Sequence, residues 1–269
     1  DSGIVAEVET LVLGFGRSKA APKAEPAIVV LNAQGAMEVQ VPSSLGQRVT
    51  DISIGPEGTL VTILGAAKKA QGFSLVGNTL SPQTTSTMGL QQVALPAPNA
   101  FAVGTLYGPE PRSHGGLEIR AADGSVRFPP TVRGIRTMIL TDVDRNGVPD
   151  LVVGDGWHFR YGHEAQALLS VYPGPDFTER VAIGTLPGSY PINEIIPIQS
   201  GGGTTLIVLG SSEVAQFKRT GLGWEHERLS AADSQTQIGL WSRSGLFRLL
   251  SPDHWLLVAG TNPKMIKIR

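Results

Sequence analysis

The chain has 269 residues, with 22 lysines and arginines against 23 aspartates and glutamates, and a formal net charge of -1. A charge this small gives no overall attraction for a polyanion, so no nucleic-acid partner is expected, and no run approaches the about 20 apolar residues that cross a bilayer. The 33 glycines and 19 prolines, with only 17% charged residues, favour many short strands joined by turns over helices.

A unit of two apolar strands around a short turn, with a glycine at the end of the second strand, recurs along the chain. It occurs at residues 51–65, 92–104, 137–154, 194–210 and 246–260, and a lone second strand precedes these units at Thr10–Gly14. The closing glycines are 39 to 56 residues apart, at Gly14, Gly65, Gly104, Gly154, Gly210 and Gly260. Periods of about 40–50 residues with four short strands each are typical of a β-propeller. The second strands are almost entirely apolar, which predicts burial on both faces.

Further strand candidates fill the third and fourth positions between these units. They are Ala27–Leu31, Met37–Val41, Gly116–Arg120, Ser125–Phe128, Ala167–Tyr172, Glu179–Ile183, Glu213–Lys218 and Trp224–Arg228, and Lys264–Ile268 follows the last glycine. The sequence therefore predicts an all-β propeller of about six four-stranded blades in a single domain, residues 1–269, with the ring closed by N- and C-terminal strands. Five or seven blades remain open. A two-sheet sandwich also has evenly spaced strands, but it gives no reason for the period.

Residues 142–150, Asp-Val-Asp-Arg-Asn-Gly-Val-Pro-Asp, have the ligand spacing of a calcium loop. Calcium takes several oxygen ligands at about 2.4 Å from a tightly wound backbone, and a glycine at position six permits the bend. The predicted Ca²⁺ ligands are the side chains of Asp142, Asp144, Asn146 and Asp150 and the backbone carbonyl of Val148. Strand-like runs flank the loop, so it is not an EF-hand. The alternative is an acidic turn that binds no metal.

The stretch from residue 138 to residue 154 resembles the FG-GAP/VCBS repeat, which occurs in integrin α-chain propellers and in many bacterial extracellular proteins. The resemblance implies that the loop joins the first two strands of a blade and binds calcium, and it points to adhesion-type roles. It is limited to this stretch. The corresponding turns at 55–58, 97–99, 199–203 and 252–254 lack the acidic ligands and could not hold a cation alone.

A long connection after residue 154 carries the densest group of functional side chains in the chain. The candidate binding residues are Trp157, His158, Arg160, Tyr161 and His163. The histidines, with Asp155 or Glu164, could ligate a transition metal, or the aromatic and basic side chains could line a sugar or peptide pocket. The alternative is a packed loop with solvated histidines. No Gly-x-Ser-x-Gly elbow is present, and no catalytic residue is predicted.

These features predict a non-enzymatic calcium-binding propeller that acts as an interaction module or accessory subunit of an extracytoplasmic assembly, with a protein or glycan as its partner. The alternative is an extracellular hydrolase or polysaccharide lyase that uses the Trp157–Glu164 loop. A secreted, periplasmic or lipid-anchored location is expected, because such loops suit near-millimolar calcium and the chain starts at Asp1 as after processing. Membrane association would come through an anchor or a partner. The cation loop and the Trp157–Glu164 loop are expected on opposite faces.

Overall fold

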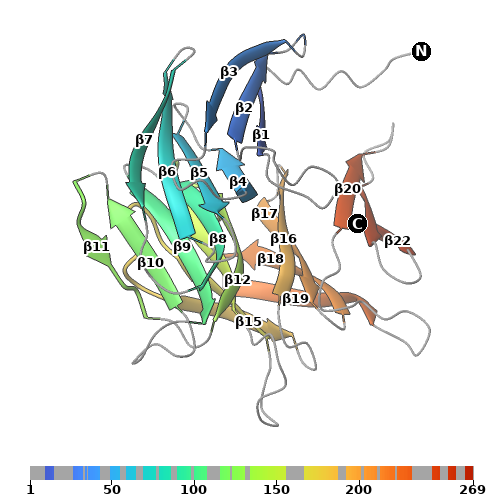
Figure 1. The fold of residues 1–269 in the computed structure, drawn as a ribbon. Helices are drawn as coiled ribbons and strands as arrows, with labels where there is room; N and C mark the ends of the chain where they lie inside the picture. The colour runs from blue at the N-terminus through green and yellow to red at the C-terminus, as the bar shows by residue number, and fades with distance from the viewer. Residues whose placement is uncertain are drawn as a thin grey trace. The chain divides into compact units, whose positions relative to one another are not determined.

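The structure is a computed structural model. It describes residues 10–14, 27–32, 34, 36–42, 49–54, 59–64, 69–76, 79–85, 90–97, 100–107, 116–121, 123–130, 134–155, 167–186, 192–200, 203–210, 213–221, 223–231, 244–248, 254–258 and 264–268. Within these ranges every regular element is a β-strand, and no helix is long and apolar enough to span a membrane. The chain divides into two compact units. Figure 1 shows the strands with their labels.

The first unit comprises Asp1–Val103 and Arg120–Val126. It contains a three-stranded sheet, β1-β2-β3, and a four-stranded sheet, β4-β5-β6-β7, each with antiparallel neighbours. The strands are β1 (Thr10–Gly14), β2 (Ala27–Asn32), β3 (Met37–Pro42), β4 (Val49–Ile54), β5 (Thr59–Leu64), β6 (Lys69–Val76) and β7 (Thr79–Thr85). A further four-stranded sheet consists of β8 (Leu90–Ala97), β9 (Ala100–Tyr107), β10 (Gly116–Ala121) and β11 (Val126–Arg127).

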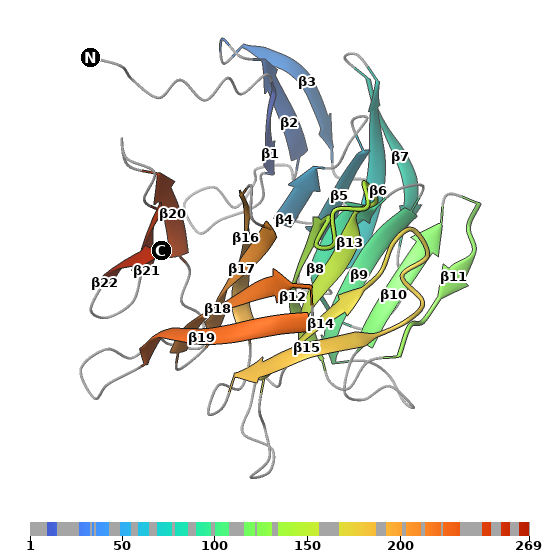
Figure 2. The same cartoon turned by 180° about the vertical axis from the view of Figure 1, so that it is seen from behind.

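The second unit comprises Gly104–Ile119 and Arg127–Arg269. It contains three antiparallel sheets, and in each sheet every strand pairs with the strand that follows it in the sequence. The first sheet is β12 (Ile135–Thr141), β13 (Asp150–Asp155), β14 (Ala167–Tyr172) and β15 (Val181–Leu186). The second is β16 (Ile192–Ser200), β17 (Gly203–Gly210), β18 (Glu213–Thr220) and β19 (Gly223–Ala231), and the third is β20 (Ser244–Arg248), β21 (His254–Val258) and β22 (Lys264–Ile268). In Figure 2 the outer strands β15 and β19 of the first two sheets lie side by side, and they are in contact.

The second strands of these two four-stranded sheets are buried on both faces, as their apolar sequences predict. In β13 the side chains of Leu151, Val152 and Val153 are at most 1% exposed. In β17 successive side chains enter different clusters, because strand side chains alternate between the faces. Leu206 contributes to the core shared with β12–β15, and Ile207 to a smaller cluster on the other face.

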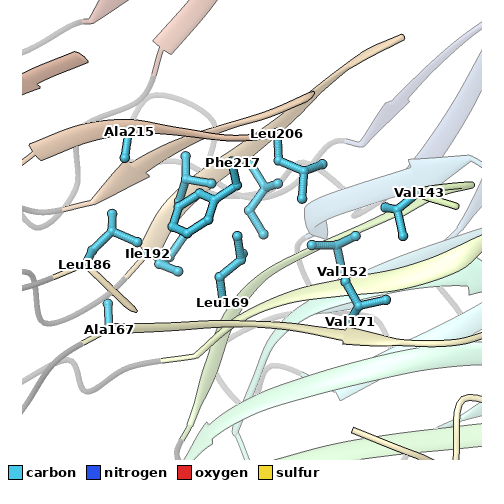
Figure 3. Close-up of a cluster of buried hydrophobic side chains, with 12 residues drawn as sticks. Val143, Val152, Ala167, Leu169, Val171, Leu186, Ile192, Leu206, Ala215 and Phe217 are labelled. Atoms are coloured by element: carbon cyan, nitrogen blue, oxygen red, sulfur yellow. The ribbon is translucent and has the colours of Figure 1, made fainter. Parts of the chain in front are cut away.

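The main described core lies between the β12–β15 and β16–β19 sheets, as Figure 3 shows. Its buried members are Val143, Val152, Ala167, Leu169, Val171, Leu186, Ile192, Ile195, Leu206, Val208, Ala215 and Phe217. A closing glycine of the repeat permits this close packing. A Cβ on Gly154 would lie 2.7 Å from the Cβ of Ile192 and 2.8 Å from Cγ2 of Thr137, so a side chain there would force the two sheets apart.

The described strands form six sheets, four with four strands and two with three. This agrees with the predicted all-β class and with repeated four-stranded sheets, and it does not fit a two-sheet sandwich. Strands β6 and β7 were not among the predicted strands. Among the described strands β1 pairs with β2 and β22 pairs with β21, so ring closure by terminal strands stays a prediction, as do the exact blade number and the single domain over residues 1–269.

Candidate metal site in the loop between strands β12 and β13

The predicted calcium loop joins β12 to β13, the first two strands of its sheet. We call residues 142–150 the cation loop. Two of its residues have left-handed backbone conformations, Arg145 with φ of 63° and Gly147 with φ of 86°. Gly147 adopts this conformation without the steric cost of a Cβ, which explains the glycine at position six. The loop therefore winds tightly enough to turn several side chains toward one point.

The polar side chains of the loop accept hydrogen bonds from its own backbone. Asp142 receives the amide of Asn146 on Oδ1 at 3.1 Å and the amide of Gly147 on Oδ2 at 2.8 Å. Asp144 receives the amide of Asn146 on Oδ1 at 3.2 Å and its side-chain Nδ2 on Oδ2 at 3.2 Å. Asn146 Oδ1 receives the amide of Val148 at 2.7 Å. These bonds hold the predicted ligand side chains of the first half of the loop against its backbone.

The last predicted side-chain ligand, Asp150, is buried, with 1% of its surface exposed. Its Oδ2 accepts the amide of Val143 at 3.0 Å, and its Oδ1 accepts the amide of Gly174 at 3.1 Å. Burial raises the pKa of Asp150, and the charges of Asp144 and Asp142 add to this effect, whereas the two backbone hydrogen bonds lower the pKa. A cation between the carboxylates would stabilise the ionised form that burial disfavours.

The donors fit one hard cation. Asp142, Asp144 and Asp150 each place a carboxylate oxygen so that all three lie within 4.8 Å of one another. Two oxygens that bind one calcium ion at about 2.4 Å can be at most about 5 Å apart. In the part of the chain that the structure describes, this is the group of acidic or histidine side chains close enough to share an ion. An all-oxygen donor set favours calcium or magnesium over zinc or copper.

The structure brings the predicted Asn146 and Val148 into the same loop. The binding candidates Trp157, His158, Arg160, Tyr161 and His163 lie outside the described residues, so their role and the predicted opposite-face arrangement stay hypotheses.

Three residues beside the loop were missed by sequence reasoning. Gly174 donates to Asp150 from the turn between β14 and β15. Gln199 and Thr204 reach Asp142 from the hairpin of β16 and β17, with donor–acceptor distances to its carbonyl oxygen of 3.3 and 3.1 Å. The available signal was the pair of polar residues, Gln199 and Thr204, that flank the glycine-rich turn of the hairpin. Their partner is not encoded in the local pattern, because it lies about 60 residues away.

No protein-family model matches the chain, and no curated protein matches its sequence. Similar solved structures include a protein from Lactobacillus plantarum, with a TM-score of 0.54 at 12% identity over 97% of this chain and 81% of that chain. Another is a chain in a nidogen/laminin complex, with a TM-score of 0.52 at 10% identity over 93% of this chain and 88% of that chain. The fold is propeller-like. At these identities the likeness shows the fold alone, and the FG-GAP/VCBS resemblance rests on residues 138–154 without a family match.

Proposed function

We propose that this propeller-like chain is a non-enzymatic calcium-binding module whose loops contact a protein or glycan partner. The observation that carries the calcium part is the convergence of Asp142, Asp144 and Asp150, whose ligand oxygens lie within 4.8 Å. Three carboxylates this close repel one another unless a cation lies between them. The buried position of Asp150 strengthens the argument, because burial of a carboxylate is costly without a compensating charge.

The proposed role of the ion is structural. Asp142 and Asp150 stand at the two ends of the loop: Asp142 directly follows β12, and Asp150 is the first residue of β13. Between them Val143, 5% exposed, packs in the core between the two sheets. An ion bound to both ends would therefore hold the loop closed over that core. Asp142, Asp144, Asn146 and Asp150 would supply side-chain oxygens and Val148 its carbonyl.

The binding role of the module is supported by two observations. A propeller-like structural neighbour belongs to a nidogen/laminin complex, so a related fold takes part in a protein complex. The chain also has an aromatic and basic stretch, Trp157–Glu164, of the composition enriched at the centres of interfaces. An extracytoplasmic location accompanies the proposal, because loops of this type are filled at the near-millimolar calcium found outside the cytosol. The hydrolase or lyase alternative has no supporting observation among the described residues.

The calcium proposal is tested by titrating the metal-free protein with Ca²⁺ in a calorimeter and by melting it with and without calcium. A ligand that binds only the folded state stabilises it by RT ln(1 + [L]/Kd), about 2.7 kcal/mol at a hundredfold excess over Kd. The double change Asp142→Ala with Asp144→Ala should abolish both signals. Asp123→Asn is the matched control, because Asp123 is an exposed aspartate in the turn before β11. A wild-type protein with no heat of binding and identical melts would refute calcium binding.

A further inference from the structure

The first ligand residue of the cation loop is held from outside by two side chains of the neighbouring sheet. The backbone carbonyl oxygen of Asp142 lies 3.1 Å from Oγ1 of Thr204 and 3.3 Å from Nε2 of Gln199. Nε2 of Gln199 also donates to Oγ1 of Thr141 at 3.0 Å, so it spans two consecutive residues at the end of β12. The β16–β17 hairpin thus contacts the loop where its first carboxylate begins.

The two side chains act as a pair. Gln199 and Thr204 are direct partners in the register of β16 and β17. Oγ1 of Thr204 lies 2.9 Å from Oε1 of Gln199, and its single hydrogen is directed to this oxygen or to the carbonyl of Asp142. Thr204 is fully buried, and Gln199 is exposed. A buried hydroxyl in this position fixes its partners, because leaving it without a hydrogen bond would be costly.

We propose that Gln199 and Thr204 are positioning residues of the cation loop, and that cation binding in return stabilises the β16–β17 hairpin. The inference rests on the proposed calcium function. Asp142 is held from inside and outside the loop: its carboxylate accepts the amides of Asn146 and Gly147, and its carbonyl faces the hairpin. Hydrogen bonds that fix the backbone carbonyl of Asp142 also fix the backbone position from which its carboxylate side chain extends. Groups behind metal ligands commonly orient the ligands in this way.

This assignment gives a role to the repeat unit at residues 194–210, which lies in the β16–β17 hairpin and whose own turn has no cation ligands. The hairpin end has no acidic ligands, since it reads Gln199, Ser200, three glycines and Thr204. It supplies hydrogen-bond donors to the loop of the preceding sheet instead. Because coupling between two equilibria is reciprocal, residues that favour the binding-competent loop must themselves be stabilised when the ion binds. Calcium should therefore protect a strand that contributes no ligand to it.

The test uses the full chain and compares three changes in β17. Thr204→Val keeps the shape of the side chain but removes the hydroxyl, whereas Thr204→Ser keeps the hydroxyl and removes only the methyl group. Thr205→Val makes the same change one residue later, on the opposite face of the strand. The Kd for Ca²⁺ is measured by calorimetry, and backbone hydrogen exchange of β17 is measured with and without calcium. Gln199→Met removes the other donor at an exposed position and serves if Thr204→Val does not fold.

Thr204→Val and Gln199→Met should each weaken calcium binding about tenfold, the lower range for residues behind a ligand. In both variants, calcium should no longer slow the backbone hydrogen exchange of β17. Thr204→Ser and Thr205→Val should keep the wild-type Kd and the wild-type effect of calcium on exchange. If the variants melt at lower temperature but keep the wild-type Kd and protection, the residues are only structural and the inference is wrong. If the wild-type protein binds no calcium, the proposed function fails first and takes the inference with it.

Discussion

The backbone amide of Gly174 donates a hydrogen bond to Oδ1 of Asp150 at 3.1 Å, across 24 residues of chain. A side chain at position 174 would run into the carbonyl oxygen of Pro149 and lie 2.8 Å from Cγ1 of Val148. The turn between β14 and β15 therefore fits against the end of the cation loop only because residue 174 has no Cβ. It gives Asp150 a fixed orientation that the loop sequence alone does not provide.

Gly174→Ala should weaken calcium binding and lower the free energy of unfolding by about 1–3 kcal/mol, the usual range for overpacking a tight site. The added methyl group would push the turn away from Pro149 and lengthen the hydrogen bond to Asp150. Calcium calorimetry and urea unfolding measure the two effects. Gly221→Ala is the matched control, because a Cβ there meets nothing within 4 Å. Equal behaviour of the two variants would show that the contact of Gly174 with the loop is unimportant.

The sequence predicted the cation loop because all its proposed ligands lie within nine residues and follow from spacing alone. It predicted the double burial of β13 and β17 because uninterrupted apolar runs leave no polar face. Strands β6 and β7 were missed, since Lys69–Val76 and Thr79–Thr85 contain mixed polar residues and a proline without a clear alternation. Here pairing with neighbouring strands decides the structure, and no local pattern records it.

The surroundings of the loop were missed for a similar reason. Gly174 and Thr204 contact the loop because two turns from other parts of the chain reach it in space. A glycine before a proline and a threonine after a run of glycines are ordinary turn residues when read in sequence. Their roles depend on how the turns pack beside the loop, which single-sequence patterns do not contain.

The buried aromatic ring of Phe217 packs between the β12–β15 sheet and the β16–β19 sheet. Phe217 is fully buried and stacks on the exposed ring of His226, with centroids 4.7 Å apart and an interplanar angle of 17°. A Cβ on Gly184 in β15 would run into its ring, so the ring fills the space between β15 and β18. In Figure 3 it lies among the side chains of the shared core, which include Leu169 and Ile192.

Phe217→Ala should lower the free energy of unfolding by about 3–5 kcal/mol, because it removes a large buried ring and leaves a cavity. His226→Ala should cost only about 0.5–1.5 kcal/mol, the value of an aromatic pair, because His226 is exposed. Urea unfolding of the wild-type protein and of the two variants at one pH measures both losses of stability. Similar losses in both variants would mean that the ring of Phe217 is not a principal part of this core.

The Trp157–Glu164 stretch is predicted to recognise the partner, whereas the cation loop is predicted to stabilise the fold. Trp157→Ala and Tyr161→Ala should then weaken binding to a partner isolated from the native source about tenfold or more, as hot-spot truncations do. They should leave the calcium-dependent shift in melting temperature unchanged. The double change Asp142→Ala with Asp144→Ala should have the opposite effects. It should abolish the calcium-dependent shift in melting temperature, and the variant should still bind the partner when the partner is present at a saturating concentration. Partner binding unaffected by both aromatic changes would remove this stretch from the interface.

Calcium stabilisation should depend on pH through Asp150. Its pKa in the folded protein is raised above 3.8, chiefly by burial, so the proton-bound form is favoured on folding. In metal-free protein this contribution to stability is complete below the unfolded pKa and is lost as the pH rises through the folded pKa. Calcium requires the ionised carboxylate, so the difference in melting temperature between calcium-loaded and metal-free protein should grow over the same range. Melting chelator-free samples from about pH 4 to about pH 8 measures this difference, and a constant value would exclude Asp150 as a ligand.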